Sequence, residues 1–453
     1  MTERKISIAF FFLLLLIGLG LYSNSSRHEF ALDDDHSIVR NPSVRSLENV
    51  PSYFTQPRTF SVLLTNIDYR PVLQTTYALN HAVAEYRMPI WHWTQVAIHI
   101  WCAMALFCFT RLLLEKVEGE RKRAILVAAL VSLAFLVHPV NSGVVNYVSA
   151  RSSSLTAAFL LTAFCLELSD RRKIAWVMML LALFTKVDAV AALAVFWGIS
   201  VLRSNAPWPG RLKGNPRRWM PYAGAVVIYM VARQFAMQGI DFAGFAGASG
   251  VTRWMYLCTQ TTVWWTYLLH WFCPFNLVAD NSVYPIYRGL LDPPVMMACL
   301  GLGVAILALW CAAKKRPHFP LLALSYLALL SPTSSVVPLA EMVNEHRPYL
   351  PVALLSLVFV TAIVNLGERL PKPGRVALAL LAVGWLGCLS VTTWQRNRVF
   401  DNASTYWADV LDKAPSARAY NNFGLILMKE GKMDEARRHF EESVRLAPGY
   451  CIA

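Results

Sequence analysis

The chain has 453 residues, of which 56% are hydrophobic and only 15% charged, with a formal charge of +14 and a mean hydropathy of +0.41. A soluble domain carries roughly a quarter charged residues, so this composition excludes an ordinary soluble protein and indicates one that sits among membrane lipids. The surplus Lys and Arg lie in short loops between apolar runs, where they report topology, and we expect no nucleic-acid partner. The nine cysteines show no CxxC spacing, which argues against a zinc site or a disulfide framework.

Apolar runs long enough to cross a bilayer, or nearly so, recur along the chain. The first follows MTERK and could be a secretory signal, but the Ser-Asn-Ser-Ser after it offers no small-x-small cleavage site, so we expect a retained span. The runs cover residues 6–22, 93–114, 124–138, 152–168, 174–187, 189–203, 219–235, 294–312, 319–333, 350–366 and 376–393. The sequence therefore predicts about 11 spans.

The loops between these runs alternate in charge. Basic residues cluster at 4–5, 116–123, 171–173, 203–218, 314–316 and 369–375. The positive-inside rule places these loops in the cytoplasm. The remaining loops, 23–92, 138–151, 186–188, 236–293 and 333–349, then share the outer face with the chain from residue 394. Arg253 to Phe272 is apolar but carries several polar residues, and we expect it to lie in the membrane plane or to re-enter.

The C-terminal segment has the pattern of a tetratricopeptide helix pair. Tyr420 and Phe423-Gly424 precede a turn at residues 430–432, Phe440 follows, and an Ala-Pro pair recurs after 33 residues. One repeat cannot bury its stacking face alone. Either residues 397–411 serve as its cap or further repeats follow, as residues 449–453 suggest.

Every unusual polar motif falls in the outer loops. The first loop carries three consecutive carboxylates and an imidazole, Asp33 to His36. The others supply, in chain order, Arg70, His138, Arg151, Lys186, Glu345, His346 and Arg347. Cations neutralise a leaving phosphate, and a carboxylate takes a proton from an attacking hydroxyl or holds a cation. The set suits transfer from a lipid phosphate, although each residue alone also fits a solvated loop, a snorkelling anchor or an interfacial ion pair.

Several of these motifs occur in an order that resembles a known family. They are the acidic pair with Ile38, Val39 and Asn41, then Tyr69-Arg70-Pro71, His138-Pro139-Val140 with Arg151, and Glu345 with Tyr349-Leu350-Pro351, all ahead of the repeat. This order is similar to that of the transmembrane and tetratricopeptide-repeat O-mannosyltransferases of the GT-C superfamily, which use polyprenyl-phosphate sugars. The chain departs from the family pattern Ser-Lys-Glu after Lys186, where it has Val187 and then Asp188.

The resemblance implies an all-α polytopic GT-C fold in residues 1–393, with the catalytic acidic motif in the outer loop 23–92, followed by a periplasmic or lumenal repeat segment in 394–453. Asp33 and Asp34 match the catalytic pair, which leaves Asp35 and His36 as bystanders or supporting groups. Arg70, His138, Arg151 and Glu345 match motif positions with donor-phosphate or structural duties. Few repeats favour a bacterial inner-membrane relative facing the periplasm, and in a eukaryote the site would face the ER lumen.

The resulting hypothesis is a one-step transfer of a sugar from a lipid-linked donor to a protein Ser/Thr or glycan hydroxyl, with inversion. Asp33 or Asp34 serves as base, and Arg151, Arg347 and Lys186 stabilise the departing phosphate. The sequence identifies no cofactor with certainty and leaves metal dependence open, since Asp33 and Asp34 could hold Mg²⁺ or Mn²⁺. The alternatives are an oligosaccharide ligase or polymerase, which would need a large late outer loop, and a non-catalytic scaffold whose repeat recruits a protein partner.

Overall fold

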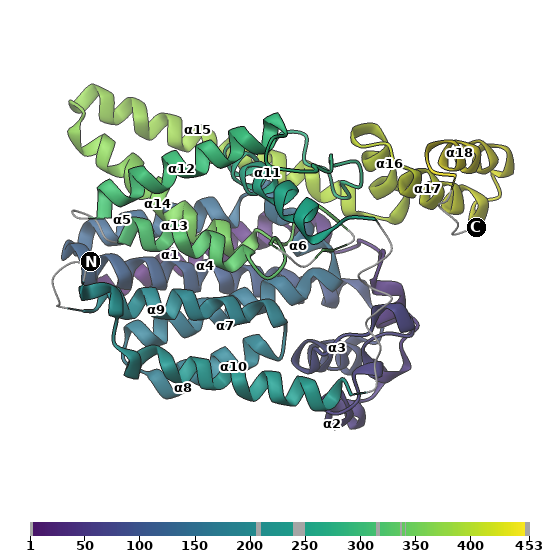
Figure 1. The fold of residues 1–453 in the computed structure, drawn as a ribbon, viewed down its shortest axis with the longest axis horizontal. Helices are drawn as coiled ribbons and strands as arrows, with labels where there is room; N and C mark the ends of the chain where they lie inside the picture. The colour runs from purple at the N-terminus through teal and green to yellow at the C-terminus, as the bar shows by residue number, and fades with distance from the viewer. Residues whose placement is uncertain are drawn as a thin grey trace.

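The computed structural model describes residues 3–204, 210–238, 250–313, 318–335, 338–339 and 341–448. Across these residues the regular structure is helical, apart from one isolated bridge between Asn281 and Val343. Most long helices lie side by side, and the C-terminal helices project from one end of this bundle (Figure 1). The prediction of an all-α chain is thereby confirmed.

Each predicted apolar run coincides with a helix. They are α1 (Glu3–Leu21), α4 (Met88–Glu118), α5 (Arg121–Leu136), α7 (Arg151–Leu168), α8 (Arg172–Leu183), α9 (Ala192–Leu202), α10 (Pro216–Ala236), α12 (Pro293–Ala313), α13 (His318–Leu330), α14 (Tyr349–Arg369) and α15 (Lys372–Asn397). Five helices of the described chain are long and apolar enough to cross a membrane, and α5 with the bent segment after it makes a sixth. Helices α1, α9 and α13 are shorter but apolar, so the protein is an integral membrane protein whose count of 11 spans stays a prediction.

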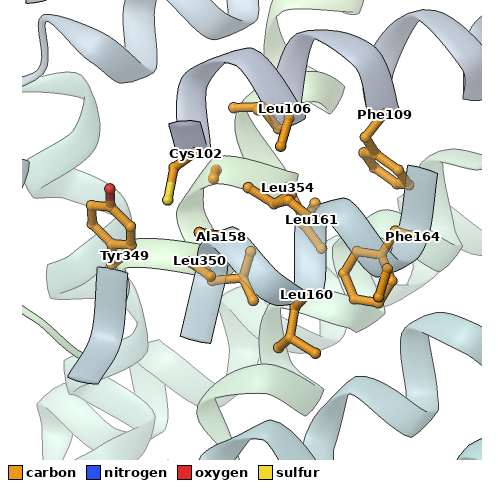
Figure 2. Packing of buried hydrophobic residues seen from close by; sticks show 14 of the residues in the cluster. Cys102, Leu106, Phe109, Ala158, Leu160, Leu161, Phe164, Tyr349, Leu350 and Leu354 are labelled. Atoms are coloured by element: carbon orange, nitrogen blue, oxygen red, sulfur yellow. The ribbon is translucent and has the colours of Figure 1, made fainter. Parts of the chain in front are cut away.

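The centre of the bundle is built by α4, α5, α7 and α14. Figure 2 shows Leu106 of α4 close to Leu161 of α7 and Leu354 of α14, with Ala158 keeping the helices close. Helices in a membrane associate through such close contact, because lipid is as apolar as the side chains. In contrast, α12 and α15 leave most of their apolar side chains exposed, as lipid-facing helices do.

Basic loops gather at the end of the bundle away from the C-terminal helices. Arg123, in the first turn of α5, donates hydrogen bonds to Asn365 and Glu368 at the end of α14. Asp170 accepts ion pairs from Arg203 and Arg218. Residues 314–316, also predicted to be in a cytoplasmic loop, lie outside the described residues. These contacts agree with one shared face for the described basic loops.

The segment from Arg253 to Phe272 forms one helix, α11, with a buried polar face. The Gln260 side chain donates to the carbonyl oxygen of Met342 at 3.0 Å. This polar face therefore contacts the loop before α14. Its inclination to a bilayer stays a prediction.

Three helices follow α15: α16 (Ala403–Lys413), α17 (Ala417–Lys429) and α18 (Met433–Leu446). A Cβ atom on Gly424 would lie 2.7 Å from the Phe440 ring, so glycine is required for the close contact of α17 with α18. Helix α16 packs on α17 through Trp407 and Val410. It therefore takes the place predicted for a cap, while residues 449–453 lie outside the described chain.

Candidate active site

The acidic loop begins just beyond α1 and is tied to the start of α7. Leu32 has a φ of 53°, an uncommon conformation for a branched side chain, and it turns the chain immediately before the acidic pair. Asp34 is buried, and its Oδ1 accepts hydrogen bonds from the Ser149 backbone N at 2.8 Å and Ser149 Oγ at 2.5 Å. Its Oδ2 accepts from the backbone N of Ala31 at 3.2 Å. Asp34 thus anchors the loop.

The two neighbouring carboxylates have opposite environments. Burial raises the pKa of Asp34 to about 7, although its hydrogen bonds from Ser149 and Ala31 act in the other direction. Burial also acts to raise the pKa of Asp33, but the hydrogen bond and charge of His36, with the Tyr147 hydroxyl, bring it below its ordinary value. The Asp33 side chain is 58% exposed. Asp33 is therefore an accessible, ionised carboxylate at neutral pH.

His36 orients Asp33. Its Nε2 lies 3.3 Å from Asp33 Oδ1, and its ring is fixed by Ser61 Oγ at 3.0 Å and by the Asn66 amide at 3.1 Å. The backbone from Asp35 to Val39 forms one π-helical turn, a feature frequent at functional sites. His36 is thus a supporting group, one of the two roles expected for it.

Asp35 points elsewhere. Its Oδ2 pairs with Arg40 at 2.6 Å, and both side chains are more than half exposed. Asp35 is a bystander of the acidic pair and a natural control for it.

Three predicted cationic or imidazole residues from two loops share one narrow cavity. Lys186, His346 and Arg347 line a space of about 40 Å³, together with hydroxyl groups of Ser153, Thr156 and Thr333. Lys186 Nζ lies 3.2 Å from Ser153 Oγ. The Arg347 guanidinium donates to the carbonyl oxygens of Glu341 and Met342, and within the described chain it makes no ion pair. The cavity therefore carries surplus positive charge.

Asp188 compensates for the departure at Val187. Lys186 and Asp188 form an ion pair of 2.8 Å, so an acid one residue later than the family pattern still reaches the lysine. The short 3₁₀ helix η9 (Val187–Ala191) begins directly after Lys186 and turns Asp188 back toward it.

Arg70 lies beside this basic cavity. It pairs with Asp68 at 2.6 Å, and the charges of Asp68 and Asp188 raise its pKa even though burial acts to lower it. Burial holds the pKa of His346 well below its ordinary value, and the charges of Lys186, Arg347 and Arg70 act in the same direction. These mutual effects place Arg70, Lys186, His346 and Arg347 in one electrostatic cluster, which we call the basic cluster.

Tyr77 connects the acidic loop with the basic cluster. It lies on helix α3 (Pro71–Ala84) and is almost fully buried, and Ser149, the partner of Asp34, is among the groups that act on its pKa. Burial is the largest influence on the Tyr77 pKa and raises it. The charge of Asp34 also raises this pKa, and the charge of Arg70 lowers it. Nothing in the sequence marks Tyr77 as a site residue. It could be recognised only as part of an amphipathic helix after the Tyr-Arg-Pro motif.

Arg151 is fully buried beneath the acidic loop. Its Nε donates to Gln95 at 2.7 Å and its Nη1 to Asn80 at 2.6 Å, while the rings of Tyr77 and Trp91 cover its guanidinium. Its Nη2 has no partner in the described structure. In this conformation Arg151 joins α3, α4 and α7. It would act on a ligand only indirectly, by holding these three helices in position.

His138 and Glu345 lie outside both groups. The His138 Nε2–H donates to the carbonyl oxygen of Trp271 at 2.7 Å, and the imidazole stacks on that indole. Glu345 accepts two hydrogen bonds from Arg396, at 2.7 and 2.8 Å, in a buried ion pair with the end of α15. In this structure both side chains join helices to one another, and their part in donor binding stays a prediction.

The acidic pair does not fit a divalent cation. Both oxygens of Asp34 are engaged by protein donors, and the described residues contain no group of three or more His, Cys, Asp or Glu side chains able to hold a metal. Carboxylate ligands of Mg²⁺ or Ca²⁺ would need free oxygens. No reaction step is therefore assigned to a metal ion at this site.

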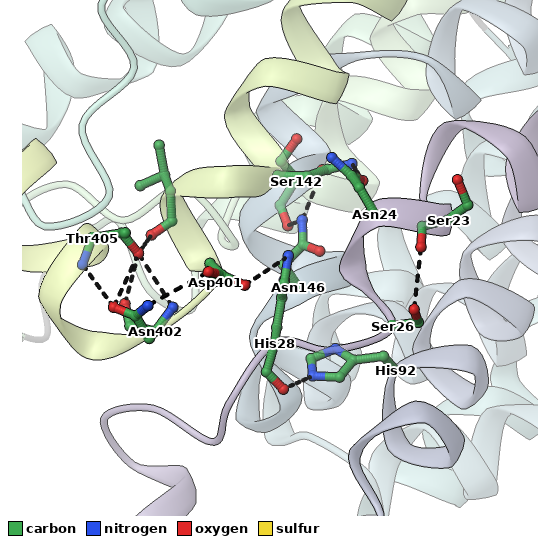
Figure 3. Close-up of polar contacts among 12 residues, drawn as sticks. Ser23, Asn24, Ser26, His28, His92, Ser142, Asn146, Asp401, Asn402 and Thr405 are labelled. Atoms are coloured by element: carbon green, nitrogen blue, oxygen red, sulfur yellow. Dashed lines mark hydrogen bonds and ion pairs between the residues drawn. The ribbon is translucent and has the colours of Figure 1, made fainter.

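The C-terminal helices are fastened to the acidic loop (Figure 3). The backbone N of Glu29 donates to the carbonyl oxygen of Asp401 at 2.8 Å, and the Asp401 carboxylate lies 4.0 Å from His28. The Asn146 amide donates to Asn397 at 2.8 Å. These contacts hold the repeat segment on the same end of the bundle as Asp33.

Comparison with known proteins agrees with the resemblance found in the sequence. A tetratricopeptide-repeat family model matches residues 417–450, which confirms the predicted repeat in α17 and α18. A protein O-mannosyl-transferase of Caenorhabditis elegans is 22% identical over 97% of this chain and 63% of the relative. Protein O-mannosyl-transferase TMTC3 of Mus musculus is 26% identical over 42% of this chain and 20% of the relative.

Protein O-mannosyl-transferase Tmtc3 of Drosophila melanogaster is 22% identical over 94% of this chain and 54% of its own length. The chain thus spans less than two thirds of each of these relatives. Among solved structures, ArnT from Cupriavidus metallidurans bound to undecaprenyl phosphate covers 98% of this chain, with 75% of its own length matched, 12% identity and a TM-score of 0.44. That score is too low for a structural conclusion.

Proposed function

We propose that this protein is a GT-C type glycosyltransferase that moves a sugar from a polyprenyl-phosphate donor to a hydroxyl acceptor on the outer face of the membrane. The observation that carries the proposal is that the chain combines an accessible, ionised carboxylate, Asp33, with a basic cluster around a small cavity. Tyr77 lies between the two groups, because the charges of both Asp34 and Arg70 act on it. The names of the relatives support the transferase class. The outer face is the periplasm of a bacterial inner membrane, or the lumen if the membrane is that of the ER.

In the proposed reaction Asp33 is the general base. The acceptor hydroxyl gives its proton to the Asp33 carboxylate while its oxygen bonds to the anomeric carbon of the donor. The bond from that carbon to the phosphate oxygen breaks, and the electron pair leaves with the phosphate. One displacement inverts the anomeric carbon. His36 holds Asp33 in place, and Asp34 holds the loop.

The basic cluster stabilises the leaving phosphate. Arg347 and Lys186 face the cavity directly, and charge-assisted hydrogen bonds from such groups strengthen as negative charge develops. Arg151 was included with them in the sequence-based hypothesis, but its burial and its four hydrogen bonds to Gln95, Asn80 and Thr76 give it a positioning role instead.

The two alternatives have less support. A ligase or polymerase would need a large late outer loop, and the loop before α14 is short. The non-catalytic scaffold was favoured by Val187, but Asp188 supplies the acid that this position lacks.

The decisive measurement is transfer of labelled sugar from a lipid-linked donor, with the full chain in membranes. Asp33→Asn should lose activity by about 10²–10⁴-fold, the usual contribution of a general base. The matched control is Asp35→Asn, which removes a neighbouring surface carboxylate and should leave the rate unchanged. Full activity in Asp33→Asn would refute the proposed role.

A further inference from the structure

A second, larger cavity lies between the acidic loop and the repeat segment. Its volume is about 840 Å³, and its lining combines Asp33 with Ser282 from the loop after α11 and with Trp407, Arg418, Asn421 and Leu425 from α16 and α17. Asp33 therefore lies at the edge of a cavity whose other wall is formed by the C-terminal helices.

The wall of this cavity is held by ion pairs. Arg418 of α17 lies 3.2 Å from Asp280 and 3.2 Å from Glu341, two acids on separate outer loops. The Asp280 side chain is almost fully buried, and such a pair keeps its geometry better than an exposed one. Together with the contacts of Asp401, these pairs fix α17 relative to Asp33.

Asn421 is the unexplained group of this wall. Its residue is only 7% exposed, yet its side-chain amide makes no hydrogen bond within the described chain, although it borders the cavity. Its neighbour Asn422 donates to the carbonyl oxygen of Arg418 at 2.8 Å, within the helix. The Asn421 amide is not among the fully buried unpaired polar atoms of the described chain, so it faces the cavity, where a ligand can pair with it.

We propose that this cavity is the acceptor site and that it binds the acceptor as an extended polypeptide, with the Asn421 amide pairing with a peptide group and a Ser or Thr hydroxyl presented to Asp33. The inference rests on the proposed function, which it deepens by assigning the acceptor a binding site between the acidic loop and the C-terminal helices. The tetratricopeptide segment is then a wall of the active site rather than a separate recruitment module.

The lining fits a polypeptide better than a glycan. A side-chain amide offers one donor and one acceptor, the same pair that a peptide group presents. Apolar side chains of Leu32, Val283, Leu425 and Leu446 lie between the polar groups, where they can contact the side chains of a peptide. A glycan has hydroxyl groups on most carbons, and burying them against these apolar residues would leave them without partners.

Binding can be measured apart from catalysis. The probe is a fluorescent, degenerate short peptide library with one fixed central threonine, titrated without donor onto the full chain in lipid nanodiscs. Asn421→Leu removes the amide, and Leu425→Trp narrows the cavity from the same helix. Each should weaken binding about tenfold, as expected for the loss of one or two hydrogen bonds or of the space for the ligand. Lys429→Leu, on the exposed end of the same helix, is the matched control and should bind as the parent does.

The possible results separate the two proposals. Unchanged binding in both Asn421→Leu and Leu425→Trp would overturn the acceptor site, since together they remove the amide and narrow the space that the peptide is proposed to use. A neutral oligosaccharide that binds the parent and is lost in both variants, while the peptide library is unaffected, would make this a glycan site and overturn the inference as well. Peptide binding in the parent without any sugar transfer would instead refute the proposed function and leave the site standing.

Discussion

The two adjacent carboxylates differ in a way that the pH dependence of transfer can test. The pKa of Asp33 lies below its ordinary value of 3.8, so as a base it is ionised throughout the neutral range. The pKa of Asp34 is raised to about 7, so as a base it would be largely protonated in mild acid. If Asp33 is the base, the rate should change little from about pH 5 to about pH 8; if Asp34 is the base, it should fall about tenfold per pH unit below about 7.

The matching substitutions sharpen this test. Asp33→Asn should lose about 10²–10⁴-fold of the rate. Asp34→Asn keeps an oxygen for Ser149 but turns an amide toward the backbone N of Ala31, so it loses about one hydrogen bond, worth about 1 kcal/mol. It should therefore keep most of the rate and the same flat pH profile.

The assay is single-turnover transfer of labelled sugar in nanodiscs at saturating donor, with each protein measured across the pH range. A parent rate that falls steeply below about pH 7, together with an inactive Asp34→Asn protein, would show that the buried carboxylate is the base and would refute the reasoning.

The remaining predictions concern stability and donor binding. The folded-state pKa of Asp34 is raised, so the contribution of Asp34 to stability is greatest below the ordinary value of 3.8 and should fall by at most about 4 kcal/mol as pH rises to about 7. Thermal unfolding of Asp34→Asn should lack this part of the parent's pH dependence. Arg347→Gln should lower kcat/KM for the lipid donor about 10–100-fold, with Arg40→Gln as the surface control. Gly424→Ala should cost about 1–3 kcal/mol in a thermal melt, because its Cβ meets Phe440, whereas Gly384→Ala, with open space around it, should not destabilise. No difference between the two glycine variants would contradict the packing described for α17 and α18.

Local sequence patterns are sufficient to predict the helices and the repeat. Hydropathy and charge are local properties, and a run of about 20 apolar residues forms a helix in a membrane whatever its neighbours are. The repeat was equally local, because Gly424 and Phe440 belong to one helix pair. The alternation of basic loops, also a local property, predicts that the polar residues lie in the outer loops.

Which of those residues come together depends on the tertiary packing. Lys186 and Arg347 meet across a sequence separation that no local pattern reports, whereas Glu345, two residues from Arg347, is drawn to Arg396 on another helix. Asp33 and Asp34 are neighbours in sequence, yet one lines the acceptor cavity and the other is buried against Ser149. Charge, burial and hydrogen bonding depend on which segments pack together, and the contacts that bring those segments together are made across the whole chain.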